Sequence, residues 1–206
     1  MQAALVAAAS ASVRAPLRAV IVPGNGDGNV RNSNWYAWLE EKLIEDPVFD
    51  EVVLRDMPDP VAARRSKWLP FMVDDLGANE RTVVIGHSSG AVAAMRLLET
   101  HKLHGVLLVS ACHTDLGDLG ERASGYYPPS GGPWKWGDIR RNAGGNIRIL
   151  HSDNDPFIPL EEAEHVADSL SVALQVEPGR SHFFKPCDAL FDAALAVAAA
   201  EPSWTP

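Results

Sequence analysis

Cysteines and long apolar runs are scarce in this sequence, and both scarcities exclude classes of protein. Only two of the 206 residues are cysteines, Cys112 and Cys187, which are too few for a disulfide framework and favour a reducing compartment. No stretch approaches about 18 uninterrupted apolar residues, the length that a membrane-spanning helix needs. We therefore expect neither a disulfide-rich scaffold nor a membrane protein.

Basic clusters and metal-binding patterns are missing as well. The formal net charge is −9, and a surface this acidic repels the phosphate backbone of nucleic acids. No His-Glu-x-x-His pattern and no cysteine pair with ligand spacing occurs, so we expect no metal site. Gly24-x-Gly26-x-Gly28 follows a predicted strand, but its third glycine comes one position too early for a dinucleotide-binding loop, and we expect no cofactor.

Acidic residues are absent from the N-terminus. Residues 1–26 contain no Asp or Glu, and Arg14 and Arg18 are the only charged side chains there. Mitochondrial presequences have such a composition, although two arginines are few for one. We interpret residues 1–16 as a disordered alanine-rich extension and expect the protein in the cytoplasm, and also in the nucleus. Import into mitochondria through this acidic-free segment is the alternative.

What the sequence does contain, from residue 17 to its end, is an alternation of apolar runs with amphipathic segments. Continuous apolar runs are typical of strands buried on both faces of a parallel sheet. The segments between them carry apolar residues at helical spacing, over 34–44, 61–76, 89–100, 160–170 and 189–200. The alternation predicts one doubly wound α/β domain over residues 17–206. Its strands are expected at 17–22, 52–54, 82–85, 105–109, 147–150 and 172–176.

One connection, over residues 109–147, is much longer than the others. Long irregular segments in compact domains are usually functional or disordered. The aromatic residues Tyr126, Tyr127, Trp134 and Trp136 argue against disorder here. We expect this segment, which follows the fourth strand, to form a short cap over a pocket at the carboxyl ends of the strands.

The most informative motif is Gly86-His87-Ser88-Ser89-Gly90, which matches Gly-x-Ser-x-Gly. It directly follows the third predicted strand and opens a predicted helix, which is the setting that a nucleophile elbow requires. The glycines let strand and helix approach without Cβ clashes, so that the serine hydroxyl projects above the sheet edge. The alternative is a Gly/Ser turn in which Ser88 or Ser89 only caps the helix. We predict Ser88 as the nucleophile of an α/β-hydrolase fold.

A serine hydroxyl is a poor nucleophile and needs a base, which an acidic residue orients. In this fold the chain order is Ser, then Asp or Glu, then His, and each partner lies on a loop after a later strand. Asp155 follows the fifth predicted strand and His182 the sixth, which predicts the triad Ser88, Asp155 and His182. We favour Asp155 over Asp153 because Pro156 restricts the backbone beside it, although the pattern alone leaves both open.

The remaining site residues follow from the same arrangement. An oxyanion hole needs two backbone N–H groups, which we expect from Ser89, after the nucleophile, and from Asn25, in the loop after the first strand. Aromatic residues on the cap and on the loops of Asp155 and His182 are expected to line the substrate pocket, unless they fill the core beneath these loops. These residues are Trp134, Trp136, Tyr126, Phe157 and Phe183.

Together these segments resemble the family of small serine hydrolases that includes retinoblastoma-binding protein 9 and related bacterial proteins. The resemblance covers roughly residues 18–190. It implies a six-stranded parallel sheet of order 2-1-3-4-5-6 flanked by helices, with the family's triad on Ser88, Asp155 and His182. The matching segments are Val22-Pro-Gly-Asn-Gly26, Trp35-Tyr-Ala-Trp38, Met57-Pro-Asp-Pro60, Trp68-Leu-Pro-Phe-Met72, Gly86-His-Ser-Ser-Gly-Ala91, Thr114-Asp-Leu-Gly-Asp118, Glu121-Arg-Ala-Ser-Gly-Tyr126, Pro133-Trp-Lys-Trp136 and Asp155-Pro-Phe-Ile-Pro159.

One departure from the family concerns its partners. The name-giving member carries a Leu-x-Cys-x-Glu stretch of the type that retinoblastoma-family pockets bind. The matching stretch here is Leu76-Gly-Ala-Asn-Glu80, in which Ala78 replaces the cysteine. We therefore do not expect this interaction in the present chain.

Two functions remain open at the level of sequence. The first is a serine hydrolase that cleaves small esters or amides, such as amino-acid esters or short acyl groups, with a small molecule as its partner. The second is a binding or scaffold protein that keeps the fold with little turnover, because one fold hosts many functions. The presence of all three predicted triad residues favours the hydrolase.

Overall fold

The computed structural model describes residues 16–26 and 28–204 of the chain. The predicted extension at residues 1–16 falls, apart from Pro16, outside the described residues. In the described part of the chain, no helix has both the length and the apolar character that crossing a membrane requires.

Six parallel strands form one sheet in the order β2-β1-β3-β4-β5-β6, which confirms the predicted order. The inner strands are almost wholly buried, which explains their continuous apolar runs. The strands span Leu17–Val22 (β1), Phe49–Leu54 (β2), Thr82–His87 (β3), Gly105–Val109 (β4), Ile147–Ser152 (β5) and Leu174–Glu177 (β6).

The two edge strands differ most from the prediction. β2 begins at Phe49, three residues before the predicted start at Val52. The prediction began too late because the exposed charges of Asp50 and Glu51 interrupt the apolar run by which it was recognised. β6 covers Leu174–Glu177 in place of residues 172–176, and its side chains are exposed or half-buried. A strand with a neighbour on only one side buries less surface, so its apolar pattern marks its bounds poorly.

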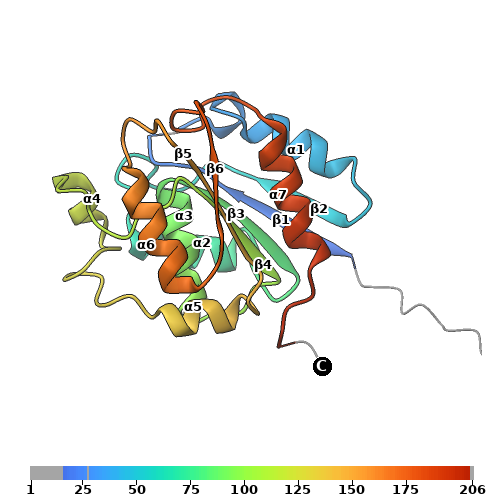
Figure 1. Ribbon diagram of the computed structural model, residues 1–206. Coiled ribbons are helices and arrows are strands. Elements are labelled where there is room, and N and C mark those ends of the chain that lie inside the picture. Colours follow the sequence, from blue (N-terminus) through green and yellow to red (C-terminus); the bar gives the residue numbers. More distant parts are fainter. Residues whose placement is uncertain (1–15, 27, 205–206) are drawn as a thin grey trace, which may run out of the picture.

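Helices cover both faces of the sheet (Figure 1). On one face lie α1 (Tyr36–Ile44) and α7 (Asp188–Ala199), and on the other lie α2 (Arg65–Asp74), α3 (Ser89–Leu98), α5 (Trp136–Asn142) and α6 (Leu160–Leu170). α2 begins later than predicted because residues 59–63 form a turn, in which the Ala63 N–H donates to the carbonyl oxygen of Asp59 at 2.9 Å.

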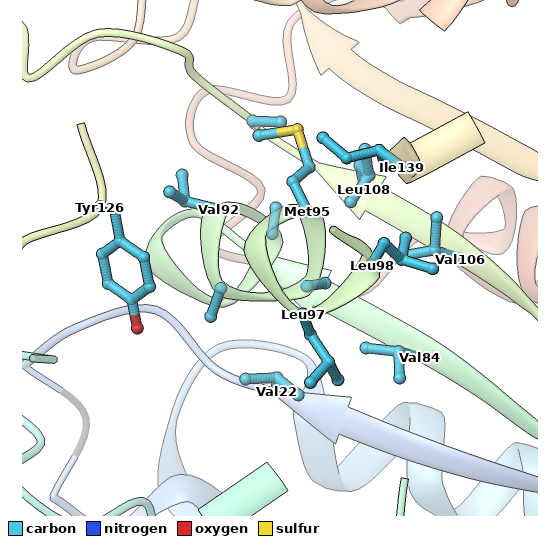
Figure 2. Close-up of a cluster of buried hydrophobic side chains, with 14 of the residues drawn as sticks. Val22, Val84, Val92, Met95, Leu97, Leu98, Val106, Leu108, Tyr126 and Ile139 are labelled. Carbon is cyan, nitrogen blue, oxygen red and sulfur yellow. The ribbon is translucent and has the colours of Figure 1, made fainter. Parts of the chain in front are cut away.

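A hydrophobic cluster lies on each face of the sheet, and the one that positions the site surrounds α3. Every residue of α3 is buried. Figure 2 shows Met95 and Leu98 of this helix among strand residues such as Val106, with Tyr126 of the long connection beside the same helix. Because α3 is enclosed on all sides, the turn that precedes it is held firmly against the end of β3.

The connection between β4 and β5 is folded and not irregular. It contains α5 and a short helix, α4 (Leu119–Ser124). α4 begins where the Asp118 side chain accepts a hydrogen bond from the Glu121 N–H at 2.9 Å, and it ends at Gly125 with φ 84°. Asp118 and Gly125 are the sequence signals of this helix, which the prediction of an irregular cap missed.

Arg96 ties this connection to α3. Its guanidinium is fully buried, donates to the carbonyl oxygens of Tyr126 and Gly132, and pairs with Glu99 at 2.5 Å. The Trp134 ring covers it, with the guanidinium carbon 3.7 Å from the ring centroid. A buried arginine that satisfies carbonyl oxygens of the cap thus fixes the cap on the helix behind the nucleophile turn.

Candidate active site

Ser88 lies at a very tight turn between β3 and α3. Its backbone has φ 53° and ψ −121°, a combination that a residue other than glycine adopts only under strain. A Cβ on Gly86 would come closer than 3.0 Å to the backbone of Gly90, and a Cβ on Gly90 would come closer than 3.0 Å to the carbonyl oxygen of Val22. The glycines of the motif are therefore required for this approach, as the sequence predicted.

His182 and Asp155 form a hydrogen-bonded pair. Nδ1 of His182 lies 2.7 Å from Oδ2 of Asp155, whose carboxylate is fully shielded from solvent. Because a carboxylate only accepts, Nδ1 carries a proton and Nε2 is left as the basic nitrogen of a neutral ring. Ser110, which follows β4, donates its hydroxyl to the same Oδ2 at 2.9 Å. Ser110 was not predicted, because nothing in its local sequence marks it.

The surroundings of Asp155 keep its carboxylate ionised. Burial by itself would raise the pKa of Asp155, but the hydrogen bond and charge of His182 offset it, together with the backbone N–H groups of Phe157 and Ile158. These two groups donate to Oδ1 at 2.9 and 3.0 Å. The net result is a pKa below the usual value of an aspartate, so the pair with His182 persists at neutral pH.

Asp153 occupies a different position in the same loop. Its carboxylate is exposed and accepts a hydrogen bond from the Gly179 N–H at 2.8 Å, which joins the loops after β5 and β6. The carboxylate that contacts His182 is that of Asp155. The structure thus distinguishes two residues that the sequence pattern left open.

Ser88 and His182 line one cavity, which we call the Ser88 cavity. Its volume is about 650 Å³, within the usual range of ligand pockets. Ser89 and Asn25 line it too, and no hydrogen bond within the described ranges occupies the backbone N–H of either residue. The structure therefore brings together all the residues predicted for the nucleophile, the base, the orienting acid and the oxyanion hole.

The predicted aromatic lining needs correction on the loop of His182. Phe157 lines the cavity and is 60% exposed. Phe183 does not, because its side chain is 1% exposed and packs in the core against the α1 and α7 side of the sheet. Phe184 lines the cavity in its place. Phe183 has a φ of 49°, and the direction in which this turn aims two successive rings cannot be read from the sequence.

Of the aromatic residues of the cap, Tyr127 lines the cavity, whereas the predicted Tyr126, Trp134 and Trp136 lie outside its lining. Tyr126 is buried in the cluster around α3 (Figure 2). Trp134 and Trp136 stack on each other with ring centroids 5.2 Å apart, and Nε1 of Trp134 donates to the carbonyl oxygen of His113 at 2.9 Å. These rings fill the space beneath the cap, which was the alternative left open, since large rings serve cores and pockets alike.

The cavity contains polar residues that sequence reasoning missed. Glu121 of α4 lines it with Asp118; its Oε1 accepts from Nδ2 of Asn25 at 3.1 Å and its Oε2 accepts from the Tyr127 hydroxyl at 3.0 Å. Burial is the main cause that raises the pKa of Glu121 above its usual value. Cys112 lies against the Tyr127 hydroxyl at 3.3 Å, and burial raises the pKa of its thiol, which therefore stays protonated.

Among residues 16–26 and 28–204, no group of three or more His, Cys, Asp or Glu side chains is placed to hold a metal ion. The glycine-rich loop after β1 packs on the nucleophile turn, and a Cβ on Gly24 would lie 3.3 Å from the Cβ of Ser88. This loop therefore belongs to the surroundings of the serine.

Comparison with known sequences agrees with this geometry. A family model described as serine hydrolase matches residues 19–187. Serine hydrolase RBBP9 of Rattus norvegicus is 48% identical to this chain over 168 residues, which are 82% of this chain and 88% of the rat protein.

Solved structures share the architecture. The ydeN gene product of B. subtilis has a TM-score of 0.74 and 22% identity, over 89% of this chain and 100% of that chain. A meta-cleavage product hydrolase of Pseudomonas fluorescens has a TM-score of 0.60 and 15% identity, over 88% of this chain and 89% of that chain. At such identities the likeness shows the fold alone.

Proposed function

The chain belongs to the serine hydrolase family, and we therefore propose that it cleaves small esters or amides through an acyl-enzyme formed on Ser88. The observation that carries this proposal is the hydrogen-bonded pair of His182 and Asp155, with Ser88 and His182 lining one cavity. A reactive serine differs from a helix-capping serine in having a base beside it. That His182 lines the same cavity as Ser88 supports this role for it.

In the proposed reaction, Nε2 of His182 takes the proton of the Ser88 hydroxyl as its oxygen attacks the substrate carbonyl carbon. The protonated imidazole then gives this proton to the departing alcohol or amine, which leaves the acyl group on Ser88. Water attacks the acyl-enzyme by the same route and releases the acid. Asp155 holds the Nδ1–H of His182 and stabilises the positive ring that forms in each step.

We assign the stabilisation of the negative charge that develops on the carbonyl oxygen to the backbone N–H groups of Ser89 and Asn25. Support comes from their place in the wall of the Ser88 cavity and from the absence of another acceptor for them in the described part of the chain. Ser89 is also the first residue of α3, and the N-terminus of a helix favours negative charge.

The chemistry of the cavity favours a small substrate with an amino group, such as an amino-acid ester. The cap contributes the carboxylates of Asp118 and Glu121, which suit an ammonium group. The loops of Asp155 and His182 contribute the rings of Phe157 and Phe184, which suit an apolar side chain. An ester with no amino group gains only the second of these contacts.

Covalent labelling with a fluorophosphonate probe tests the proposal. The probe needs a nucleophilic serine and a working base, so the wild-type protein should label and Ser88→Ala should not, with an unchanged thermal melt. Ser89→Ala is the matched control and should still label. If Ser88→Ala is labelled and Ser89→Ala is not, the nucleophile is Ser89 and not Ser88. A wild-type protein that does not label would favour a binding protein with little turnover.

We also propose the cytoplasm as the site of action, with the mitochondrion as the alternative. The two free cysteines support the cytoplasm, because they favour a reducing compartment. The N-terminal segment without acidic residues supports the mitochondrial alternative. Imaging of the full-length chain with a C-terminal fluorescent tag distinguishes the two compartments.

A further inference from the structure

A chain of hydrogen bonds runs behind Ser88 through side chains that the proposed reaction does not use. The Tyr36 hydroxyl accepts from the backbone N–H of Gly24 at 3.0 Å and from Nδ2 of Asn34 at 3.1 Å. The same hydroxyl lies 2.7 Å from Nδ1 of His87, and Nε2 of His87 lies 3.0 Å from the backbone carbonyl oxygen of His182. Tyr36 and His87 are both fully buried.

The partners fix where the protons lie. A carbonyl oxygen only accepts, so Nε2 of His87 must carry a proton and donate it to His182. The other nitrogen of a neutral ring is an acceptor, so the Tyr36 hydroxyl donates to Nδ1. Burial is the main cause that lowers the pKa of His87 to about 3, and the ring therefore stays neutral at ordinary pH. Every hydrogen bond in this series is thus donated in the same direction, from the loop after β1 toward the loop of His182.

The two ends of this chain are the two loops on which the proposed chemistry depends. Gly24 immediately precedes Asn25, whose N–H is assigned to the oxyanion hole. His182 is the proposed base. Between them, His87 is the residue before Ser88, and a Cβ on Gly24 would lie 3.8 Å from Nδ1 of His87 and 3.7 Å from the Tyr36 hydroxyl oxygen. This series of hydrogen bonds therefore connects three segments through buried polar groups alone. They are the loop of Asn25, which we call the oxyanion loop, the turn at Ser88 and the loop of His182.

We propose that Tyr36 and His87 are positioning residues, which together hold the oxyanion loop and the His182 loop at their working distance from Ser88. The inference rests on the proposed function, because it concerns the same reaction. Neither residue touches the reacting atoms; each acts through a backbone group of its neighbour. A displacement of about 1 Å at a reacting centre is enough to slow a reaction markedly, while substrate contacts elsewhere are kept.

Two substitutions break the same link of the chain. Tyr36→Phe removes only the hydroxyl, and His87→Gln keeps an amide N–H in place of Nε2–H but removes the acceptor Nδ1. We expect each to lower kcat on a nitrophenyl ester about tenfold or more with KM nearly unchanged. The double variant should be no slower than the slower single variant within about twofold, because both lose one shared interaction. A merely structural role of either residue would move the melting temperature without this split or this coupling.

Tyr126→Phe is the matched control, because the Tyr126 hydroxyl is equally buried and has no hydrogen-bond partner within the described residues. Its kcat should equal that of the wild type. Circular dichroism checks the fold of each variant, and His87→Gln carries the test if Tyr36→Phe does not fold. Folded variants with wild-type kcat, or singles whose losses multiply in the double variant, overturn the inference. The fluorophosphonate experiment tests the proposed function separately. If the wild type is labelled and Ser88→Ala is not, the proposed function holds even where this inference fails.

Discussion

At the scale of single residues, the carboxylate of Asp155 accepts hydrogen bonds from His182, from Ser110 and from two backbone N–H groups. Asp155→Asn keeps the shape but removes the charge, and an amide no longer fixes the tautomer in which Nε2 of His182 is the base. In serine proteases this change costs about 10⁴ in turnover, and we expect a large loss of kcat here. Asp153→Asn, in the same loop, should lose little. Equal losses in ester hydrolysis at both positions would contradict the assignment of Asp155.

His87 gives the native state a dependence on pH that can be measured. In the unfolded chain a histidine binds a proton near pH 6.5, whereas native His87 stays neutral down to about pH 3. Between these values the unfolded state binds more protons, so this residue lowers stability as pH falls and has no effect above pH 6.5.

Urea unfolding at pH 7 and at pH 5 measures this effect. Across the window, the wild type should lose about 1.4 kcal/mol per pH unit more than His87→Gln does. The other histidines are present in both proteins, so the difference between the two losses measures the contribution of His87. Parallel curves for the two proteins would show that native His87 is protonated in this window.

At the scale of elements, the junction of β1, β3 and α3 depends on two glycines. A Cβ on Gly90 would meet the carbonyl oxygens of Val22 and Pro23, which are backbone atoms and cannot turn aside. Gly90→Ala should therefore cost about 2 kcal/mol or more in the free energy of unfolding. Gly137→Ala is the control, because Gly137 lies in α5 with no atom within 4 Å of the added Cβ, and there alanine should be neutral or stabilising. A stable Gly90→Ala protein in urea unfolding would argue against this close approach.

The cap is the element that we propose limits the size of the substrate. α4 and the segment after it close the Ser88 cavity to about 650 Å³, and the rings of Phe157 and Phe184 border it. A long acyl chain would have to leave the cavity and lose these contacts to water. We expect kcat/KM to fall about tenfold or more from butyrate to dodecanoate in a series of nitrophenyl esters. A flat or rising profile would show that the cap opens to an extended groove.

At the scale of the whole molecule, the Leu76–Glu80 segment is part of the fold and not a free recognition motif. The Leu76 side chain is 1% exposed and Ala78 is buried, both within the cluster around α3. A partner that needs these side chains would have to unfold the segment after α2, and Ala78 replaces the cysteine of the motif. We expect no retention of the full chain on a retinoblastoma-type pocket domain. Retention that is lost in Leu76→Ala, with the fold intact by circular dichroism, would contradict this.

The α/β class and the nucleophile turn followed from residues that are neighbours in the sequence, whereas the strand order was what the family resemblance implied. Strand β3, the glycines around Ser88 and helix α3 are contiguous, and the apolar runs of the inner strands need only burial on both faces to be recognised. Asp155 and His182 followed from chain order, because parallel strands bring the loops at their carboxyl ends to one edge of the sheet. Relationships of this kind are local or repeat along the chain.

Only the tertiary structure decided which side chains face Ser88. Phe184 and not Phe183 lines the cavity, Tyr126 and Trp134 fill the space beneath the cap, and Glu121 reaches the loop of Asn25. Tyr36 and His87 lie 51 positions apart, and no local pattern relates them. Such contacts join segments that are far apart in sequence, and the direction of each side chain there depends on the packing of all its neighbours at once.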